Sequence, residues 1–296
     1  MPAHWIAFSV VIVSLLIADL ALLQRPGRPV SARLAWLWTA FLALLAGAFA
    51  LYIGRTSGRQ PALEFLSGYL IEGSMSIDNL LVFLLLFRAL QLGVEQQRRV
   101  LLWGVLGAIL FRGALIVAGT ALLARFWWME DAFGVVLAIA AVRLLLAKPR
   151  RGVVRGPVRW VRDCCLRYAS GAELAVGSLL LVIAAVEITD LLFALDSIPA
   201  VLAVTRNPWI AFTSNIFAVL GLRSLYFAIA AALDRLRLLH YGLACILGFV
   251  AFKMLAARWI AISADLSLLI IVAVLVTFAV LSKAVPGADA RPNPAA

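Results

Sequence analysis

Long apolar stretches, separated by short segments rich in Arg, Pro and Gly, make up most of this chain. A helix that crosses a lipid bilayer needs about 20 consecutive, mainly apolar residues. Stretches near that length predict helices over residues 4–24, 33–53, 62–87, 100–124, 130–147, 173–204, 208–232, 239–257 and 261–283. The first stretch has no Lys or Arg before Arg25, so it lacks the basic segment of a secretory signal and is expected to remain as a helix. The pattern predicts an all-α, polytopic helical membrane protein with about nine transmembrane helices.

Composition supports a membrane protein, because 65% of the 296 residues are hydrophobic and only 14% are charged. The net charge of +11 does not indicate a nucleic-acid partner, since most of the basic excess lies in alternate loops. Seventeen Lys and Arg residues lie on one side of the predicted helices and five on the other. The positive-inside rule then predicts an N-terminus outside and a C-terminus in the cytoplasm. Three Cys and two His, without a spaced metal motif, make a thiolate or imidazole metal site unexpected.

Two predicted helices carry carboxylates, each of which costs about 2.5–3.5 kcal/mol at the centre of a membrane helix. The segment GYLIEGSMSIDNLLVF holds Glu72 and Asp78, with Asn79 following. The segment VEITDLLFALDSIPAV holds Glu187, Asp190 and Asp196, with Ser197 following. Glu72 and Asp78 are six residues apart, as are Asp190 and Asp196, which indicates one motif used twice.

The six-residue spacing has a geometric consequence, because six residues of a continuous helix turn by about 240°. Both acids of a motif could face one cavity only if the helix were interrupted. Gly73 and Pro199 are the candidate positions, since proline removes a backbone donor and freed carbonyls can line a cavity. Carboxylates, an amide oxygen and freed carbonyls form an all-oxygen site, which suits hard divalent cations such as Mn²⁺, Ca²⁺ or Mg²⁺.

An alternative interpretation is that the acids form structural ion pairs with the four basic residues inside predicted helices, namely Arg112, Arg143, Arg223 and Lys253. Five acids exceed four cations, and static pairing does not require the same spacing twice, so a cation pathway is favoured. Asp19, near the end of the first helix, is expected to reach the membrane interface and pair with a loop arginine.

The sequence also repeats beyond the acids. WGVLGAILFR (103–112) resembles NIFAVLGLRSLYF (215–227), and FGVVLAIAAVRLLLA (133–147) resembles YGLACILGFVAFKMLAA (241–257). An offset of three helices predicts a 3+3 inverted-topology repeat, an arrangement used by many secondary transporters. The predicted organisation is two N-terminal helices (1–60), a first repeat of three helices (61–148), a basic cytoplasmic loop (149–172), a second repeat (173–258), a C-terminal helix (259–284) and a disordered tail (285–296).

The motif stretches at 64–87, 99–112, 186–227 and 241–255 resemble the TerC family of integral membrane proteins, named for tellurium resistance, whose members include bacterial manganese exporters. The resemblance implies a nine-span protein of the bacterial inner membrane that moves Mn²⁺ out of the cytoplasm. The metal ligands implied for this chain are Glu72, Asp78, Asn79, Glu187, Asp190, Asp196 and Ser197, with Asn215 as a further one. In one departure, Gly73 stands where the family commonly has Lys.

Two functions follow from these observations. The first is a secondary exporter of Mn²⁺ or another hard divalent cation, in exchange for protons, because carboxylates can bind either. No nucleotide-binding P-loop is present, and neither an enzyme nor a resident cofactor is expected. The second is a non-transporting membrane scaffold or tellurite stress-response protein whose acids form structural ion pairs.

Overall fold

The computed structural model describes residues 2–23, 31–90, 92–146, 176–230, 239–260 and 262–284. These residues form nine helices and no strands, and each predicted apolar stretch corresponds to one helix. The helices are α1 (Pro2–Leu23), α2 (Ala32–Thr56), α3 (Arg59–Ala89), α4 (Val94–Arg125), α5 (Met129–Leu146), α7 (Val176–Leu202), α8 (Pro208–Ala230), α9 (Leu239–Leu255) and α10 (Ala264–Ala284). The predicted basic loop 149–172 and tail 285–296 lie outside the described residues.

The helices have the character of membrane spans. Within the described residues, four of them are long and apolar enough to cross a bilayer, namely α2, α4, most of α8 and most of α10. Large apolar side chains are exposed on the outside of the bundle, including Ile17, Leu44, Leu110 and Leu269. Exposed leucines and isoleucines in this number are expected where lipid is the solvent. The prediction of an all-α, polytopic helical membrane protein is confirmed.

Local sequence sets where several helices begin. The hydroxyl of Ser31 accepts a hydrogen bond from the Leu34 amide at 3.1 Å and caps α2. Asn207 does the same for α8, where its side-chain oxygen accepts from the Trp209 amide at 3.0 Å and Pro208 occupies the first helical position. Gly58 has a φ of 101°, which permits the tight turn between α2 and α3.

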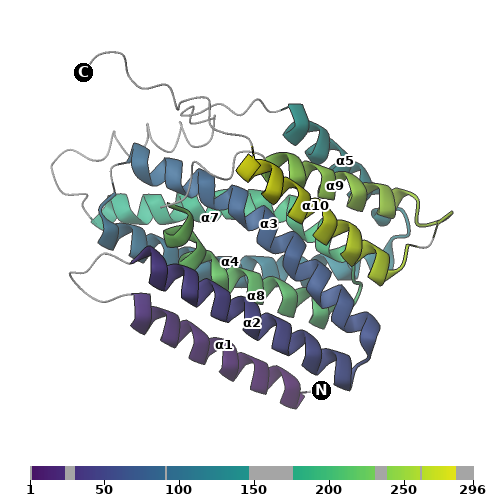
Figure 1. The fold of residues 1–296 in the computed structure, drawn as a ribbon, viewed down its shortest axis with the longest axis horizontal. Helices are drawn as coiled ribbons and strands as arrows, with labels where there is room; N and C mark the ends of the chain where they lie inside the picture. Colours follow the sequence, from purple (N-terminus) through teal and green to yellow (C-terminus); the bar gives the residue numbers. More distant parts are fainter. Residues whose placement is uncertain are drawn as a thin grey trace.

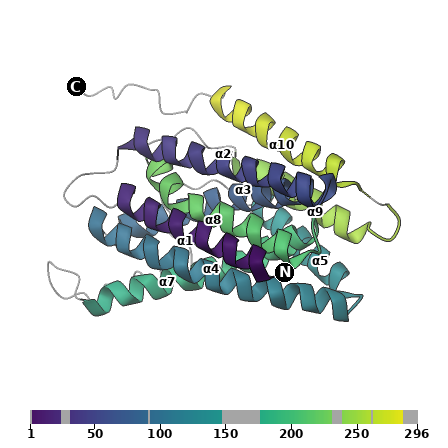
Figure 2. The same cartoon turned by 90° about the horizontal axis from the view of Figure 1, so that it is seen from below.

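The bundle is organised around contacts between residues 59–146 and residues 176–255. α3 packs mainly on α8, α4 on α7, and α5 on α9, while α3 also meets α7 and α4 meets α8. α2 covers α3 and α8, and α10 covers α3 and α9. The helices run side by side along one direction, and α1 begins at the end of the bundle opposite to the one where α10 ends (Figures 1 and 2). That placement is the one expected for an odd number of crossings.

Two ends of the bundle can be named by their connections. The 90–93 end carries the connection between α3 and α4, and the 126–128 end carries the connection between α4 and α5. α4 and α7 run parallel between these ends, since contacts keep their order from Gly104 with Val186 to Arg112 with Asp190.

The predicted interruption of the acidic helices is wrong for the described backbone. α3 continues as a helix through Gly73, and α7 continues through Pro199. Pro199 lies in the last turn of α7, where removing its amide costs only one internal hydrogen bond. The helical backbone therefore continues between Glu72 and Asp78 and between Asp190 and Asp196.

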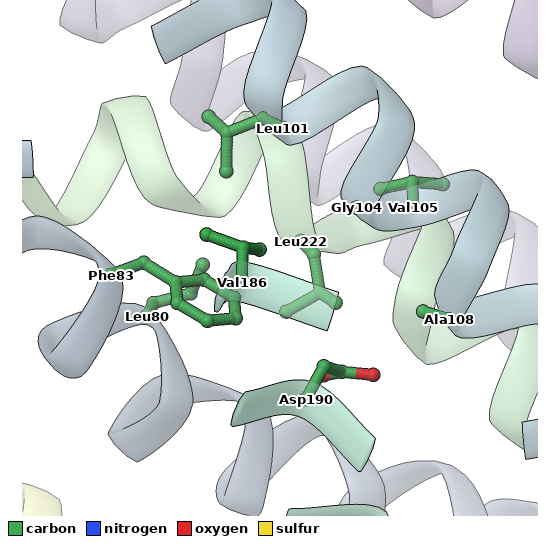
Figure 3. Close-up of a pocket in the computed structure, with 9 residues that line it drawn as sticks. All are labelled: Leu80, Phe83, Leu101, Gly104, Val105, Ala108, Val186, Asp190 and Leu222. Atoms are coloured by element: carbon green, nitrogen blue, oxygen red, sulfur yellow. The ribbon is translucent and has the colours of Figure 1, made fainter. Parts of the chain in front are cut away.

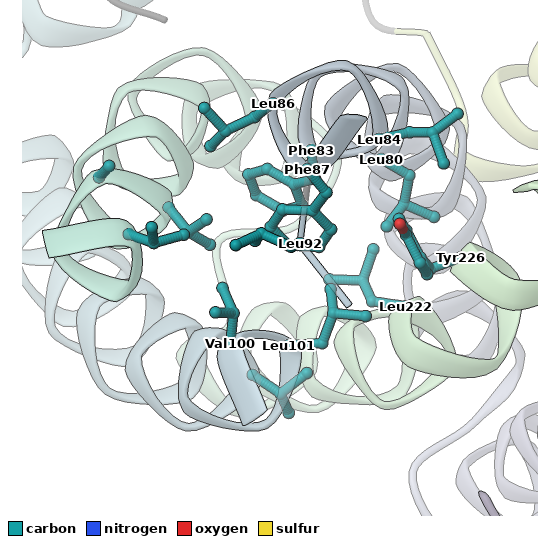
Figure 4. Close-up of a cluster of buried hydrophobic side chains, with 14 of the residues drawn as sticks. Leu80, Phe83, Leu84, Leu86, Phe87, Leu92, Val100, Leu101, Leu222 and Tyr226 are labelled. Atoms are coloured by element: carbon teal, nitrogen blue, oxygen red, sulfur yellow. The ribbon is translucent and has the colours of Figure 1, made fainter. Parts of the chain in front are cut away.

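An apolar cluster fills the bundle between its middle and the 90–93 end. Its side chains come from α3, α4, α7 and α8 (Figure 4), and include Leu80, Phe83, Phe87, Leu101, Leu222 and Tyr226. The ring centroids of Phe87 and Tyr226 lie 5.6 Å apart at an interplanar angle of 63°. This packing supplies apolar surroundings for the polar groups at mid-helix.

The 126–128 end is different, because polar contacts join elements there. Arg206 pairs with Glu130, and Arg258 pairs with Asp131 at 2.6 Å while its guanidinium lies over the ring of Trp127. The hydroxyl of Thr205 donates to Glu64 at 2.6 Å. These contacts connect α3 and α5 with the segments after α7 and α9.

Candidate functional site

Three charged residues from three helices meet in the middle of the bundle. Arg112 donates from Nε to Asp190 Oδ2 at 3.1 Å and from Nη2 to Asp190 Oδ1 at 2.9 Å. Its Nη1 forms an ion pair with Glu72 Oε1. Arg112 and Glu72 are fully buried, and Asp190 is 4% exposed. We call this group the Arg112 triad.

Each residue of the triad lies close to the middle of its helix, so the triad sits at mid-membrane depth. Glu72 and Asp190 are the first acids of the two motifs that share the six-residue spacing. The structure thus brings one acid from each motif onto a single guanidinium. The contact between Arg112 and Asp190 is bidentate, which is the strong form of an arginine–carboxylate pair.

A small cavity adjoins Asp190 on the side of the 90–93 end. Apart from Asp190 its lining is apolar, and comes from α3, α4, α7 and α8, as Figure 3 shows: Leu80, Phe83, Leu101, Gly104, Val105, Ala108, Val186 and Leu222. Its volume is about 20 Å³, which is roughly the space of one water molecule. Asp190 therefore belongs to the triad and also lines a cavity whose other walls come mainly from the apolar cluster.

Glu187 lies one helical turn before Asp190 and contacts α4 at a glycine. A Cβ added at Gly107 would overlap the Glu187 carboxylate, so only a glycine leaves room for that carboxylate against the α4 backbone. Oε2 of Glu187 has no hydrogen-bond partner among the described residues. Glu187 is partly exposed, and it places a third carboxylate within one turn of the triad.

Other predicted ligands are buried with polar atoms that no described residue satisfies. Asn79 on α3 is 5% exposed and its Nδ2 has no partner, and the Ser197 hydroxyl on α7 has none. Asn215 on α8 is fully buried with neither its amide oxygen nor its amide nitrogen bonded. Buried polar atoms are nearly always hydrogen-bonded in folded proteins, so these positions are candidates for contact with water or a ligand.

The second acids of the motifs are not placed. The backbone of Asp78 lies in α3 and that of Asp196 in α7, but their side chains lie outside the described residues. Within the described part of the chain, no group of three or more His, Cys, Asp or Glu side chains is arranged to hold a metal ion. A ligand set that includes Asp78 and Asp196 stays a prediction.

Among the described side chains, the other three intramembrane cations have partners or positions away from Glu72, Glu187 and Asp190. Arg223 on α8 pairs at 2.9 Å with Asp19 on α1, which also accepts a hydrogen bond from the indole of Trp38 at 2.7 Å. The expectation that Asp19 reaches the interface is wrong, because Asp19 is 3% exposed and its partner lies inside the bundle. Lys253 donates to Ser267 at 2.9 Å, and Arg143 lies in the last turn of α5 with an exposed side chain.

Sequence reasoning identified Arg112 only as one of four interchangeable cations, and it missed Gly107 as a contact of Glu187. Both belong to WGVLGAILFR, whose similarity to 215–227 was visible. The similarity marked the segment as important, but the choice of partners depends on which helices pack together.

Comparison with known proteins adds independent information. Residues 57–289 match the sequence profile of the integral membrane protein TerC family. A Salmonella typhi protein named "Putative membrane-bound redox modulator Alx" is 41% identical, over 93% of this chain and 92% of its own length. An "Uncharacterized membrane protein STKORF319" of Myxococcus xanthus is 37% identical, over 98% of this chain and 96% of its own. No solved structure matches the chain. With its nine described helices, its acidic motifs on α3 and α7 and a profile match over most of its length, the chain belongs to the TerC family of integral membrane proteins.

Proposed function

We propose that this protein is a secondary transporter that exports a hard divalent cation, Mn²⁺ in first place, from the cytoplasm in exchange for protons. The observation that carries the proposal is the meeting of Glu72 and Asp190, from two related motifs, at mid-membrane depth. Ionisable groups at that depth are costly, and in membrane proteins they mark ion pathways. No enzymatic activity and no resident cofactor are part of the proposal.

The charge balance around the triad favours a cation as cargo. When ionised, the carboxylates of Glu72, Asp190 and Glu187 outnumber the single guanidinium of Arg112, so the region holds an excess of negative charge. An entering divalent cation would neutralise that excess. An oxyanion such as tellurite would be repelled by the same groups.

The donor chemistry favours a hard cation. The predicted ligands Glu72, Asp78, Asn79, Glu187, Asp190, Asp196, Ser197 and Asn215 offer oxygen atoms and no sulfur or imidazole nitrogen. Cys245 lies on α9 with an exposed side chain. Carboxylate, carbonyl and hydroxyl oxygens suit Mn²⁺, Mg²⁺ and Ca²⁺, whereas Cu⁺ prefers thiolates and thioethers.

The transport proposal includes an inverted repeat, with 61–148 and 173–258 as its halves. Exchanging α3, α4 and α5 for α7, α8 and α9 converts the α3–α8 contact into the α4–α7 contact and maps the α5–α9 contact onto itself. This exchange supports two halves of opposite orientation around one central site. The proposal includes a location in the bacterial inner membrane, and the excess of Lys and Arg in alternate loops supports an N-terminus outside and a C-terminus in the cytoplasm.

A non-transporting scaffold is the second candidate, and one observation favours it. Glu72 and Asp190 are both already held by Arg112, as acids in a static structural pair would be. In that case the triad would stabilise the packing of α3, α4 and α7, and the protein would act through partners in stress resistance.

Flux measurements separate the two candidates. The purified full chain in proteoliposomes should transport Mn²⁺, Ca²⁺ and Zn²⁺ to different extents, with Mn²⁺ fastest and accelerated by a pH gradient. The E130Q variant is a matched control, since Glu130 is an acid of the 126–128 end that pairs with Arg206. Correctly folded protein that moves none of these cations, with or without a gradient, would contradict the transport proposal and favour the scaffold.

A further inference from the structure

Arg112 contacts the same carboxylate oxygens of Asp190 and Glu72 that a bound cation would need. Both oxygens of Asp190 accept from the guanidinium, at 2.9 and 3.1 Å, and Oε1 of Glu72 pairs with Nη1. A metal ion bound to these carboxylates and the guanidinium in its present position would bring like charges together in an apolar environment. Arg112 and a divalent cation therefore compete for one place.

We propose that Arg112 is an internal counter-cation of the carrier, which holds Glu72 and Asp190 when no cargo is bound and is displaced when a divalent cation binds them. The inference rests on the proposed transport function and assigns a role that the function alone does not require. The pairing of Arg112 with Glu72 and Asp190, which favours a scaffold, then represents the state of the transporter without bound cation.

Burial makes such a counter-cation necessary. Glu72 is fully buried and Asp190 is 4% exposed, so neither charge is screened by solvent when the cargo leaves. An uncompensated buried carboxylate is strongly unfavourable. With Arg112 in place, one of the two carboxylates is already neutralised and the return needs a proton only on the other. Without Arg112, both acids must be protonated before the carrier can return.

Arg223 is not placed to substitute for Arg112. Its guanidinium already pairs with Asp19, and it lies toward the 90–93 end of α8. Lys253 donates to Ser267 and no described contact joins it to the triad. Among the described residues, Arg112 is the cation that contacts the acids of both motifs.

The inference makes a specific prediction for the R112Q variant. Its Mn²⁺ affinity should rise by about tenfold or more, since each tenfold step needs only a modest gain in binding free energy. Exchange of internal for external Mn²⁺ should continue, because the carrier has Mn²⁺ bound in both the outward and the inward transition. Net Mn²⁺ efflux, measured at one alkaline pH on both sides, should fall severalfold, because the return without Mn²⁺ then requires protons on both acids and protons are scarce at that pH.

Mn²⁺ binding to the full chain in detergent, followed by electron paramagnetic resonance of free Mn²⁺, and paired flux assays in proteoliposomes test this. R112K is the second variant: lysine lacks the planar fork of arginine, so its Mn²⁺ affinity should lie between those of the wild type and R112Q, with net efflux largely kept. R258Q, at an exposed pair of the 126–128 end, controls for handling and should match the wild type.

The outcomes are distinct. If the wild type neither binds nor transports Mn²⁺, the proposed function itself is refuted. A wild type that transports, with R112Q or R112K binding Mn²⁺ no more tightly than it does, overturns the counter-cation. So does a folded R112Q variant that loses exchange and net efflux in equal proportion. If R112Q does not fold, the affinity of R112K alone decides.

Discussion

Two buried arginines, Arg112 and Arg223, come from similar segments and do different work. Arg112 contacts one acid from each motif at the centre of the bundle. Arg223 contacts Asp19 on α1, outside both predicted repeats, with Trp38 of α2 as a second partner of that acid. One arginine thus joins the acidic motifs, and the other attaches the N-terminal helices to the bundle.

The difference can be traced to spacing. Arg112 follows Gly107 by five residues, whereas Arg223 follows Gly221 by two. Three residues correspond to about 4.5 Å along a helix and a rotation of about 300°. Arg223 therefore meets α1, where Arg112 in its own segment meets α7. A repeat in sequence places an arginine on each helix, but its position along the helix decides the partner.

The largest effect is expected for R112Q measured without metal. Removing the guanidinium leaves Glu72 and Asp190 buried without their partner, and breaking a buried pair costs about 3–5 kcal/mol in soluble proteins. The melting temperature in detergent should fall accordingly. Saturating Mn²⁺ should raise the melting temperature of R112Q by more than it raises that of the wild type. An equal rise in melting temperature on adding Mn²⁺ to the two proteins would contradict competition between Arg112 and Mn²⁺ for the same carboxylates.

R223Q should lose a similar or slightly smaller free energy of unfolding, about 3–5 kcal/mol, because Asp19 is left buried with only the Trp38 hydrogen bond. Mn²⁺ should raise the melting temperature of R223Q by as much as that of the wild type, since the described partner of Arg223 is Asp19 and not Glu72 or Asp190. The D19N/R223Q double variant should recover part of the loss. A larger rise in R223Q on adding Mn²⁺ would connect this pair to the site and weaken the comparison.

The glycines of the two segments give a matched test of intermediate size. A Cβ at Gly107 would overlap the Glu187 carboxylate, whereas a Cβ at Gly221 has no neighbour within 4 Å. G107A should destabilise by about 1–3 kcal/mol, as overpacking does. G221A should be neutral or stabilising by up to about 1 kcal/mol, because alanine favours a helix over glycine. Equal melting temperatures for the two variants would argue against the Glu187 contact.

The smallest effect belongs to the exposed pairs of the 126–128 end. R206Q removes the partner of Glu130, and exposed ion pairs contribute about 0.2–1 kcal/mol. The loss of stability should shrink further at high salt, because screening weakens exposed pairs. Melting curves at low and high salt measure this, and a loss as large as that of R223Q would show that the pair is not a surface contact.

Much of the fold could be predicted from the sequence, because a helix in a bilayer must be apolar over its whole length. The nine predicted stretches correspond to the nine described helices for this reason. The acids of α3 and α7 were equally visible, since any charge in an apolar stretch is conspicuous. The positions of the helices and of the acids within them can therefore be predicted from the sequence alone.

The partners of those acids could not be predicted, because they depend on how helices distant in sequence pack. Arg112 selects Glu72 and Asp190 through the α3, α4 and α7 contacts, and Asp19 finds Arg223 because α1 packs on α8. The expected break at Pro199 was wrong for a simpler reason. A proline in the last turn of a helix loses little, and sequence alone did not place that turn.

Mn²⁺ efflux from proteoliposomes, compared between the wild type and D190N, tests the central claim most directly. Asparagine keeps the size of the side chain and one oxygen but removes the charge that Arg112 and the cation share. D131N, at the exposed 126–128 end, provides the control. The account predicts that the wild type and D131N transport Mn²⁺ at comparable rates, while folded D190N loses at least about tenfold in Mn²⁺ affinity and transports little. D190N that is folded and transports Mn²⁺ at the wild-type rate would contradict it.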